Sequence, residues 1–551
     1  MSNIKYFQSN KMKKILFIAL FMASKVTFAQ KPNADLLITN ATIYTVNANF
    51  DQAEAIAVKS GKIIAVGKTT DLIKKYKAVK SINAEGKFIY PGFYDAHAHF
   101  YSFGMNLQTV NLKGTQSFQE VLDKVVAFQK EKNVNFIQGR GWDQNDWKVK
   151  EFPTKKELDL LFPDTPVALT RIDGHAMLAN SKALELAGIT KETKITGGQI
   201  EVKNGELTGI LVDNPMEKVY AIVPKPKKET QIQALKDAQK VMFDYGLTTI
   251  NEAGLEKEII DLIDTLQQNN ELDINIYAMV KATQDNVDLY TQLGVYQTDK
   301  LNVRSFKFMG DGALGSRGAC LHKEYTDKPN HFGALLSPVA DIRKMAKQIA
   351  DSDYQMNSHA IGDSTNAVLL NIYKEVLKDK TNRRWKIEHA QIMQEKDFDA
   401  FSMGIIPSVQ PTHATSDMYW AEQRVGAARI KNSYAYKKML NKAGIIALGT
   451  DFPIEEVNPM YTFYAAVARK DLKNYPEGGF QPENALTREE TLKGMTIWAA
   501  YSNFEENEKG SLEVGKWADF IVFDNDLLTE DLDAIPFVKP VNTFVKGKQV
   551  K

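Results

Sequence analysis

The sequence is poor in cysteine, with Cys320 as its single thiol among 551 residues, and this excludes an intrachain disulfide. A chain of this length buries enough apolar surface to be stable without such cross-links. It also lacks an excess of charge of one sign, since 69 Lys and Arg stand against 68 Asp and Glu. Because nucleic-acid-binding proteins usually present a strongly basic face, this balance argues against a nucleic-acid partner.

Long hydrophobic runs are also scarce, and the apolar run at residues 15–23 is too short to cross a bilayer. It follows Lys11, Lys13 and Lys14, and a short polar stretch after it leads to the small residue Ala29. This order is typical of a secretory signal peptide, which we predict over residues 1–29. We therefore expect an exported protein, periplasmic or secreted, with no stable membrane span after leader removal. Initiation at Met12 would leave a more typical leader, and a buried N-terminal helix is the alternative.

Both ends of the chain consist of short apolar runs separated by turn residues. Within residues 35–90, two such runs are joined through Gly61, which is the pattern of a β-hairpin. Residues 510–523 and 541–550 show the same pattern of short apolar runs separated by turn residues. We predict a small β-sandwich domain assembled from residues 30–90 and 501–551; two unrelated terminal hairpins are the alternative.

The middle of the chain, residues 91–500, alternates buried strand patterns with helical patterns, which is typical of a parallel sheet. Eight strand candidates can be counted, at residues 88–99, 247–253, 274–280, 303–309, 355–359, 385–389, 405–410 and 445–451. Helical patterns lie between most of them, at residues 230–245, 342–350, 367–377 and 395–402. Eight strands favour a closed (β/α)8 barrel, the TIM barrel, over an open sheet.

A large insertion separates the first two strand candidates and covers about residues 100–246. It contains a capping-box pattern from Ser117 to Glu120, which predicts the start of a helix. It also contains a tryptophan-rich segment at residues 141–147. An insertion at the carboxyl end of a barrel strand lies over the active-site face, so we predict that it forms a substrate lid.

His97 and His99 lie at the end of the first strand candidate. In an extended strand, residues i and i+2 point to the same side, so both imidazoles can face the barrel axis. Two imidazoles placed in this way can bind one metal ion. A His-x-His pattern alone is weak evidence, but its position at a strand end strengthens it.

Other strand candidates end on residues of the same chemistry. His359 and His389 follow the fifth and sixth candidates, Asp451 follows the eighth, and Lys307 lies in the fourth. Because barrel chemistry is located at strand carboxyl ends, we interpret these residues as one site rather than as separate core side chains.

Six motifs carry a family resemblance. They are PGFYDAHAH at 91–99, DGALGSR at 311–317, SHAIGD at 358–363, IEHA at 387–390, GTDFP at 449–453 and GKWAD at 515–519. The sequence resembles the amidohydrolase superfamily, and in particular its family-3 branch, which includes N-substituted formamide deformylase-like proteins. The motifs span residues 91–519, and the DGALGSR run is the one most specific to this branch.

The resemblance implies a (β/α)8 barrel with a β-sandwich built from both chain ends. It implies metal ligands at His97, His99, His359 and His389, with Asp451 as the catalytic carboxylate. Lys307 matches a position where many relatives carry a carboxylated lysine bridging two metals; a simple pairing with an acid is the alternative. The cofactor is then one or two divalent ions, with zinc as the first choice and manganese and iron still open.

The implied reaction is hydrolysis of a non-peptide carbon–nitrogen bond, in a small amide or N-substituted formamide, by metal-activated water. Asp451 would accept the proton of that water and deliver it to the leaving amine. Esterase, lactonase or deaminase chemistry on the same barrel is an alternative, and a non-catalytic metal-stabilised binding protein is another. The partner is a small-molecule substrate, and a homodimer is the default assembly.

Five further residues are predicted to contact substrate, each with a structural alternative. His175 belongs to a segment resembling the family, but an ordinary loop histidine fits equally. Trp142 and Asp143 could line the pocket, although a tryptophan packed beneath a lid is the commoner outcome. Arg317 could bind a substrate carboxylate or form a structural salt bridge. His413 follows the seventh strand candidate and could contact substrate or lie in a surface loop.

Overall fold

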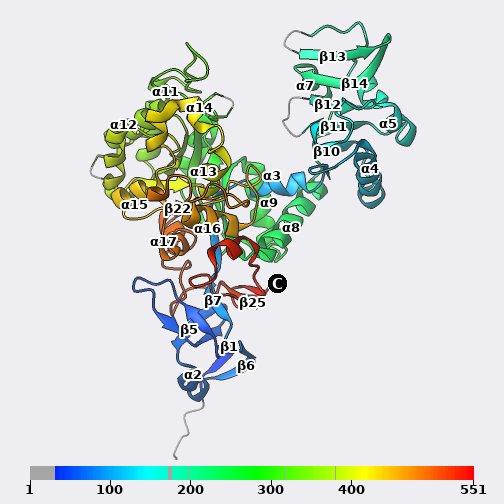
Figure 1. Ribbon diagram of the computed structural model, residues 1–551. Coiled ribbons are helices and arrows are strands. Elements are labelled where there is room, and N and C mark those ends of the chain that lie inside the picture. The colour runs from blue at the N-terminus through cyan, green and yellow to red at the C-terminus, as the bar shows by residue number, and fades with distance from the viewer. Residues whose placement is uncertain (1–30, 172–175, 196–197, 316, 379) are drawn as a thin grey trace, which may run out of the picture.

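The computed structural model describes residues 31–551 apart from 172–175, 196–197, 316 and 379. The predicted signal peptide therefore lies outside the described residues. Figure 1 shows a central barrel, a small β-domain on one side of it, and a separate lobe formed by the insertion. In the part of the chain that is described, no helix is long and apolar enough to cross a membrane.

The central domain is the predicted (β/α)8 barrel. Eight parallel strands follow one another around it in chain order: β8 (Phe93–Ala98), β15 (Leu247–Leu255), β16 (Asn275–Lys281), β18 (Leu301–Met309), β19 (Gln355–Ala360), β20 (Lys386–His389), β21 (Ile406–Val409) and β22 (Ala447–Leu448). A two-residue strand, β17 (Tyr296–Gln297), pairs antiparallel with β18. Parallel neighbours in this order place all strand carboxyl ends at one mouth.

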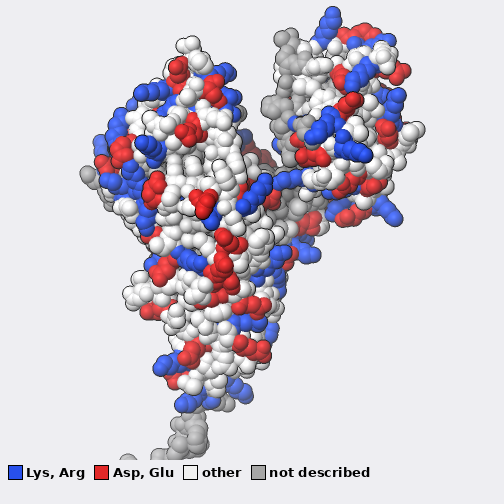
Figure 2. Space-filling view, in the orientation of Figure 1, with Lys and Arg blue, Asp and Glu red and all other residues white. Residues whose placement is uncertain are grey.

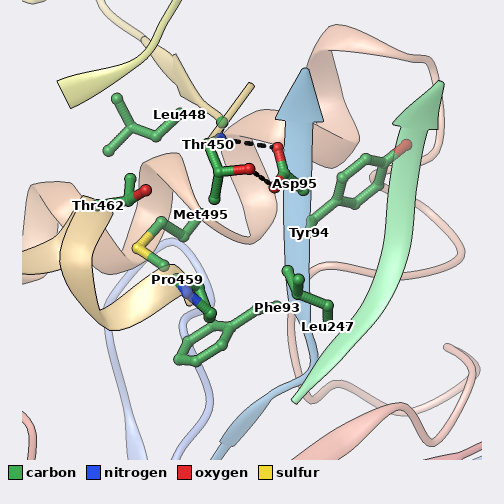
Figure 3. Close-up of a pocket in the computed structure, with 10 residues that line it drawn as sticks. Phe93, Tyr94, Asp95, Leu247, Leu448, Thr450, Pro459, Thr462 and Met495 are labelled. Carbon is green, nitrogen blue, oxygen red and sulfur yellow. Dashed lines mark hydrogen bonds between the residues drawn. The ribbon is translucent and has the colours of Figure 1, made fainter. Parts of the chain in front are cut away.

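The barrel closes between β8 and the segment after β22. The Asp451 backbone N–H donates to the His97 carbonyl at 2.8 Å, and the His99 N–H donates to the Phe452 carbonyl at 2.8 Å. The Asp95 carboxylate accepts hydrogen bonds from the Thr450 backbone N–H at 3.0 Å and from its hydroxyl at 2.7 Å (Figure 3). A small, mainly apolar pocket lies beside this junction (Figure 3). Closure thus brings the first and last strand ends together.

Helices cover the outside of the barrel. The predicted helices form as α8 (Lys228–Asp244), α11 (Val339–Ala350), α12 (Asp363–Leu377) and the 3-10 helix η3 (Glu395–Met403). Further helices are α3 (Phe100–Asn106), α9 (Lys257–Gln268), α10 (Gln284–Leu293), α13 (Pro411–Asp417), α14 (Ala421–Arg429), α15 (Tyr436–Ala443), α16 (Pro459–Ala468), α17 (Arg488–Gly494) and α18 (Ile497–Ser502). In α9, Ile259, Ile263 and Leu266 are buried at helical spacing, which holds this helix against the strands.

Two strand predictions at the barrel junction were wrong in extent. Residues 88–99 are not one strand, because the chain leaves the β-domain strand β7 (Phe88–Pro91) and enters β8 after Gly92. The Gly92 N–H donates to the Asp519 carbonyl at 2.9 Å, and a Cβ at Gly92 would lie 2.2 Å from the Thr248 hydroxyl oxygen. The eighth strand is only two residues long, because the backbone turns into the site after it.

The small β-domain is the predicted sandwich, built from both chain ends. One sheet has the order β5 (Lys62–Gly67), β4 (Ala55–Lys59), β1 (Asn33–Thr39), β6 (Lys77–Asn83). The other has the order β25 (Lys548–Gln549), β24 (Asn542–Val545), β23 (Phe520–Phe523), β7, β2 (Thr42–Tyr44), β3 (Gln52–Ala53). Ile38, Val58, Phe520 and Phe544 share its core. Because β7 pairs with β23, two unrelated hairpins are excluded.

The β-domain also contains a short helix, α2 (Thr69–Lys75), which was not predicted.

The insertion folds into a lobe with its own sheet and cores. The sheet has the order β13 (Gly198–Lys203), β14 (Glu206–Asp213), β12 (Ala176–Ala179), β11 (Val167–Arg171), β10 (Ile137–Trp142), β9 (Val110–Asn111). Its helices are α4 (Phe118–Lys132), α5 (Lys156–Leu161), α6 (Ser181–Leu186) and α7 (Pro215–Tyr220). The lobe stands beside the barrel at the far end of α3 and α8, and charges of both signs are mixed over the visible face (Figure 2). Its role as a lid stays a prediction.

The predicted capping box at the start of α4 is half formed. The Ser117 hydroxyl accepts a hydrogen bond from the Glu120 N–H at 3.2 Å, as expected of an N-cap. The Glu120 carboxylate accepts from the Gln116 N–H at 2.8 Å, one residue before the position that a capping box requires.

Candidate metal centre

The histidines at the strand ends converge at the barrel mouth. The ring centroids of His97 and His389 are 4.8 Å apart, those of His359 and His389 are 4.6 Å apart, and those of His97 and His99 are 5.7 Å apart. The four residues come from three strands, β8, β19 and β20, and the segment just after β8. The structure therefore assembles the histidines predicted as ligands into one cluster.

Asp451 faces this cluster from the segment after β22. Its Oδ1 lies 3.2 Å from His99 Nε2 and 3.8 Å from His97 Nε2. His97, His99 and Asp451 form a group whose ligand atoms could hold one metal ion. The backbone φ of Asp451 is +63° and that of His389 is +73°, in the left-handed region that non-glycine residues rarely adopt. Such conformations are typical of sites where geometry is imposed by function.

Two buried acceptors orient the histidine rings from behind. A Glu388 carboxylate oxygen lies 2.6 Å from His97 Nδ1, and the Gln410 amide oxygen lies 2.7 Å from His389 Nδ1. Each contact places the ring proton on Nδ1 and leaves the Nε2 lone pair for the centre. We did not predict either acceptor. The available signal for Glu388 was that Lys386 and Glu388 place two charges at alternate positions of a strand predicted to be buried, and all four residues of that strand are buried.

Lys307 lies inside the cluster. Its side chain is buried on β18, and its Nζ is 2.8 Å from His97 Nε2. Burial lowers the pKa of its ammonium group, while the nearby carboxylates of Glu388, Asp451 and Glu252 act in the opposite direction. With the ring proton of His97 on Nδ1, its Nε2 accepts a hydrogen bond from the Lys307 nitrogen, and burial is the effect that favours the neutral amine.

The protonation states of the cluster fit a divalent cation. Burial, reinforced by Lys307, lowers the pKa of His359 to about 3, so its imidazole is neutral. Burial raises the pKa of Asp451, but donors from His413 and His99 outweigh it and hold this pKa well below its ordinary value. Within the described chain, His359 Nε2 is buried with no hydrogen-bond partner. Neutral imidazoles and an ionised carboxylate are the forms that bind divalent metals.

His413, predicted after the seventh strand as a possible substrate contact, lies beside Asp451, a contact that was not predicted. It lies on α13, and its Nε2 is 3.2 Å from Asp451 Oδ2, while its Nδ1 is 2.9 Å from the Glu455 carboxylate. Burial lowers the pKa of His413, but the hydrogen bonds from its ring to the two carboxylates outweigh this and raise the pKa well above the usual value. The ring is 13% exposed, which separates it from an ordinary surface-loop histidine.

The remaining predicted substrate contacts lie in other surroundings. Trp142 is 1% exposed in the core of the inserted lobe, and its Nε1 donates to the Leu169 carbonyl at 2.8 Å, so its ring is covered rather than lining a pocket. Asp143 forms an ion pair with Arg171 on β11. Arg317 forms a salt bridge with Asp327 at 2.8 Å, which is the structural alternative considered for it. His175 lies outside the described residues.

Comparison with known proteins places this centre in a family. A model of the family-3 branch of the amidohydrolase family matches residues 80–551. The chain belongs to the amidohydrolase family. This amidohydrolase is 32% identical over 543 residues to protein LONG AFTER FAR-RED 3 of Arabidopsis thaliana, covering 94% of this chain and 91% of the relative.

Two further comparisons connect the amidohydrolase to proteins with more descriptive names. It is 25% identical over 542 residues to the N-substituted formamide deformylase of Arthrobacter pascens, covering 93% of this chain and 97% of the relative. The crystal structure of a metal-dependent hydrolase from Pyrococcus horikoshii OT3 is similar with a TM-score of 0.76 and 28% identity, covering 90% of this chain and 99% of that one.

Proposed function

We propose that this amidohydrolase hydrolyses a carbon–nitrogen bond other than a peptide bond, in a small amide or an N-substituted formamide. The observation that carries the proposal is the ionised Asp451 carboxylate facing His97 and His99 at the barrel mouth. A non-catalytic binding protein has no need of an acid–base carboxylate at that position. The similarity to an N-substituted formamide deformylase supports the choice of bond.

The residues that would hold the metal are His97, His99, His359, His389 and Asp451, and we propose zinc, as one or two ions. A bound zinc ion supplies a Lewis acid and lowers the pKa of water in the site. Lys307 is proposed to be carboxylated and to bridge two ions. A neutral, buried amine is the form that reacts with carbon dioxide, and the lowered pKa of Lys307 supports this.

The protein side chains have two further roles in the proposed reaction, proton transfer and orientation of the histidine rings. Asp451 accepts one proton from the attacking water as the new carbon–oxygen bond forms, and it delivers this proton to the leaving nitrogen as the carbon–nitrogen bond breaks. Glu388 and Gln410 hold His97 and His389 in the tautomer that presents Nε2 to the site. The backbone contacts that close the barrel fix Asp451 relative to His97.

We further propose that the protein is exported to the periplasm or secreted. The order of basic, apolar and small residues over positions 1–29 supports export. Because the chain has a single cysteine, it forms no intrachain disulfide, and its fold does not depend on whether the compartment is oxidising.

The test is metal content per chain, measured beside turnover of amide, formamide and matched ester substrates. Wild type is expected to hold bound metal and to favour the amide or formamide, while Lys307→Ala holds less metal. Asp451→Asn should lose activity by roughly 100-fold or more, since general acid–base catalysis contributes about 10²–10⁴-fold. A well-folded wild type without tightly bound metal would overturn the proposal, and preference for the ester would favour the esterase or lactonase alternative.

A further inference from the structure

Asp451 contacts a further histidine, His413, whose ring lies beside the cluster with its centroid 5.9 Å from that of His389. Its Oδ1 faces His99 Nε2 at 3.2 Å, whereas its Oδ2 faces His413 Nε2 at 3.2 Å. The two oxygens of one carboxylate therefore have different nearest neighbours, His99 for Oδ1 and His413 for Oδ2, and the next ring to Oδ2 is that of His389, whose Nδ1 is 4.0 Å away. A carboxylate that can rotate freely about its terminal bond would not keep this distinction.

The ring of His413 is itself held in place by Glu455. The Glu455 Oε1 lies 2.9 Å from His413 Nδ1 and also accepts from the Ser416 hydroxyl at 2.6 Å. Ser416 lies three residues after His413 on α13, so both side chains lie on the same face of that helix and contact the same carboxylate oxygen. Glu455 follows Asp451 by four residues, in the segment after the short strand β22.

The chemistry of the three groups sets the direction of the hydrogen bonds. Ionised carboxylates only accept, so each ring nitrogen of His413 is matched to an acceptor. Hydrogen bonds with charged partners are shorter and stronger than neutral ones, and they are strengthened further by burial. The result is a chain in which Glu455 orients the His413 ring and the ring orients the Asp451 carboxylate.

We propose that His413, supported by Glu455, is a positioning residue that keeps Asp451 Oδ1 directed toward His97 and His99. The inference rests on the proposed function, since it assigns to Asp451 the proton transfers of the hydrolysis. It replaces the direct substrate contact expected for His413. Misplacement of a reacting group by about 1 Å can lower a rate by about 100-fold, so loss of His413 should lower kcat on that scale and leave KM nearly unchanged.

The variants are His413→Leu, which removes both ring contacts, and His413→Gln, whose amide can still donate toward Asp451. Glu455→Leu and Glu455→Gln form a second pair, in which Gln keeps an acceptor for Nδ1. His322→Leu is the matched control, because His322 is an exposed histidine. In each pair the conservative variant should recover part of the kcat that the leucine variant loses.

A readout that needs no substrate is obtained with Co²⁺ titrated into chelator-treated protein. His413→Leu should bind the same number of Co²⁺ ions as wild type but with a changed visible spectrum, because Asp451 presents its oxygen differently. His413→Gln should return toward the wild-type spectrum. Loss of a bound ion in His413→Leu would make His413 a metal ligand and overturn the positioning role.

Thermal unfolding of the metal-free protein provides the second readout. If His413 acts through Asp451, the shifts in Tm caused by His413→Leu and Asp451→Asn should not add in the double variant. Additive shifts with an unchanged Co²⁺ spectrum would overturn the proposal, as would a raised KM with unchanged kcat. If wild type hydrolyses neither amides nor formamides, the proposed function fails, while the spectrum and the Tm shifts still decide the role of His413.

Discussion

His97 Nδ1 lies 2.6 Å from a carboxylate oxygen of Glu388, and both side chains are fully buried. The carboxylate is a neighbour of the proposed metal ligand rather than a ligand itself. It fixes the imidazole tautomer and increases the basicity of Nε2. Burial raises the pKa of Glu388, but attraction to His97 and nearby lysines outweighs it, so the pKa is lowered and the carboxylate remains ionised.

Glu388→Gln is therefore expected to weaken metal binding without removing a ligand. Loss of such an orienting partner lowers metal affinity by about 10–100-fold. The measurement is the metal retained per chain in competition with a soluble chelator of known affinity. Glu395→Gln, at an exposed carboxylate paired with Lys438, is the control. Equal retention by Glu388→Gln and wild type would contradict the orienting role.

Removal of the metal should abolish turnover and lower thermal stability. When the free metal concentration is ~100 times the Kd, an ion that binds only the folded chain raises the free energy of unfolding by about 2.7 kcal/mol. A chelator removes this contribution. Activity and Tm measured before chelation, after it and after zinc is added back test this directly. A Tm that does not move with metal would mean that the centre binds no ion tightly.

Lys386 should make stability depend on pH. It is buried on β20, and burial lowers its pKa to about 8 from 10.5. Below pH 8 the lysine is charged in both states, and the fold carries the full cost of burying that charge. Between pH 8 and 10.5 the unfolded chain binds more protons, so stability rises with pH, by at most about 3 kcal/mol.

Lys386→Met removes this titration. The difference in unfolding free energy, wild type minus variant, should increase as pH rises from 8 to 10.5. Chemical denaturation at several pH values measures it, with Lys473→Met, at an exposed lysine, as the control. A difference that stays constant with pH would show that Lys386 does not carry the depressed pKa.

Trp142→Ala should destabilise the inserted lobe and leave the metal centre intact. Trp142 packs in the core of the lobe beside Trp147 and donates to Leu169. Removing a buried tryptophan costs about 3–5 kcal/mol. Limited proteolysis should then cut the lobe faster at unchanged metal content, and Leu160→Ala, at a position 83% exposed on α5, should not show this. Loss of bound metal instead would connect Trp142 to the site.

The site residues that could be predicted from the sequence are those located at the carboxyl ends of the barrel strands. His97, His99, His359, His389 and Asp451 could be grouped from sequence, because any residue that follows a barrel strand is delivered to the same mouth. Glu388, Gln410 and Glu455 could not, because each acts through the direction of its side chain toward a residue of another strand. Nothing in the spacing of residues 388 and 97 indicates that they meet.

The strand periodicity and the two β-rich ends were sufficient to predict the barrel and the sandwich, and the histidines at strand ends were sufficient to predict which side chains meet at the barrel mouth. These features are local. A strand buries every second side chain and a helix buries one face, so both patterns can be recognised from the spacing of apolar residues in the sequence. The tertiary structure decided three other things: the break of the first strand at Gly92, the covering of Trp142 inside the lobe, and the contact of His413 with Asp451 rather than with solvent. Each depends on distances between segments far apart in the chain, which packing and barrel closure set and residue spacing does not.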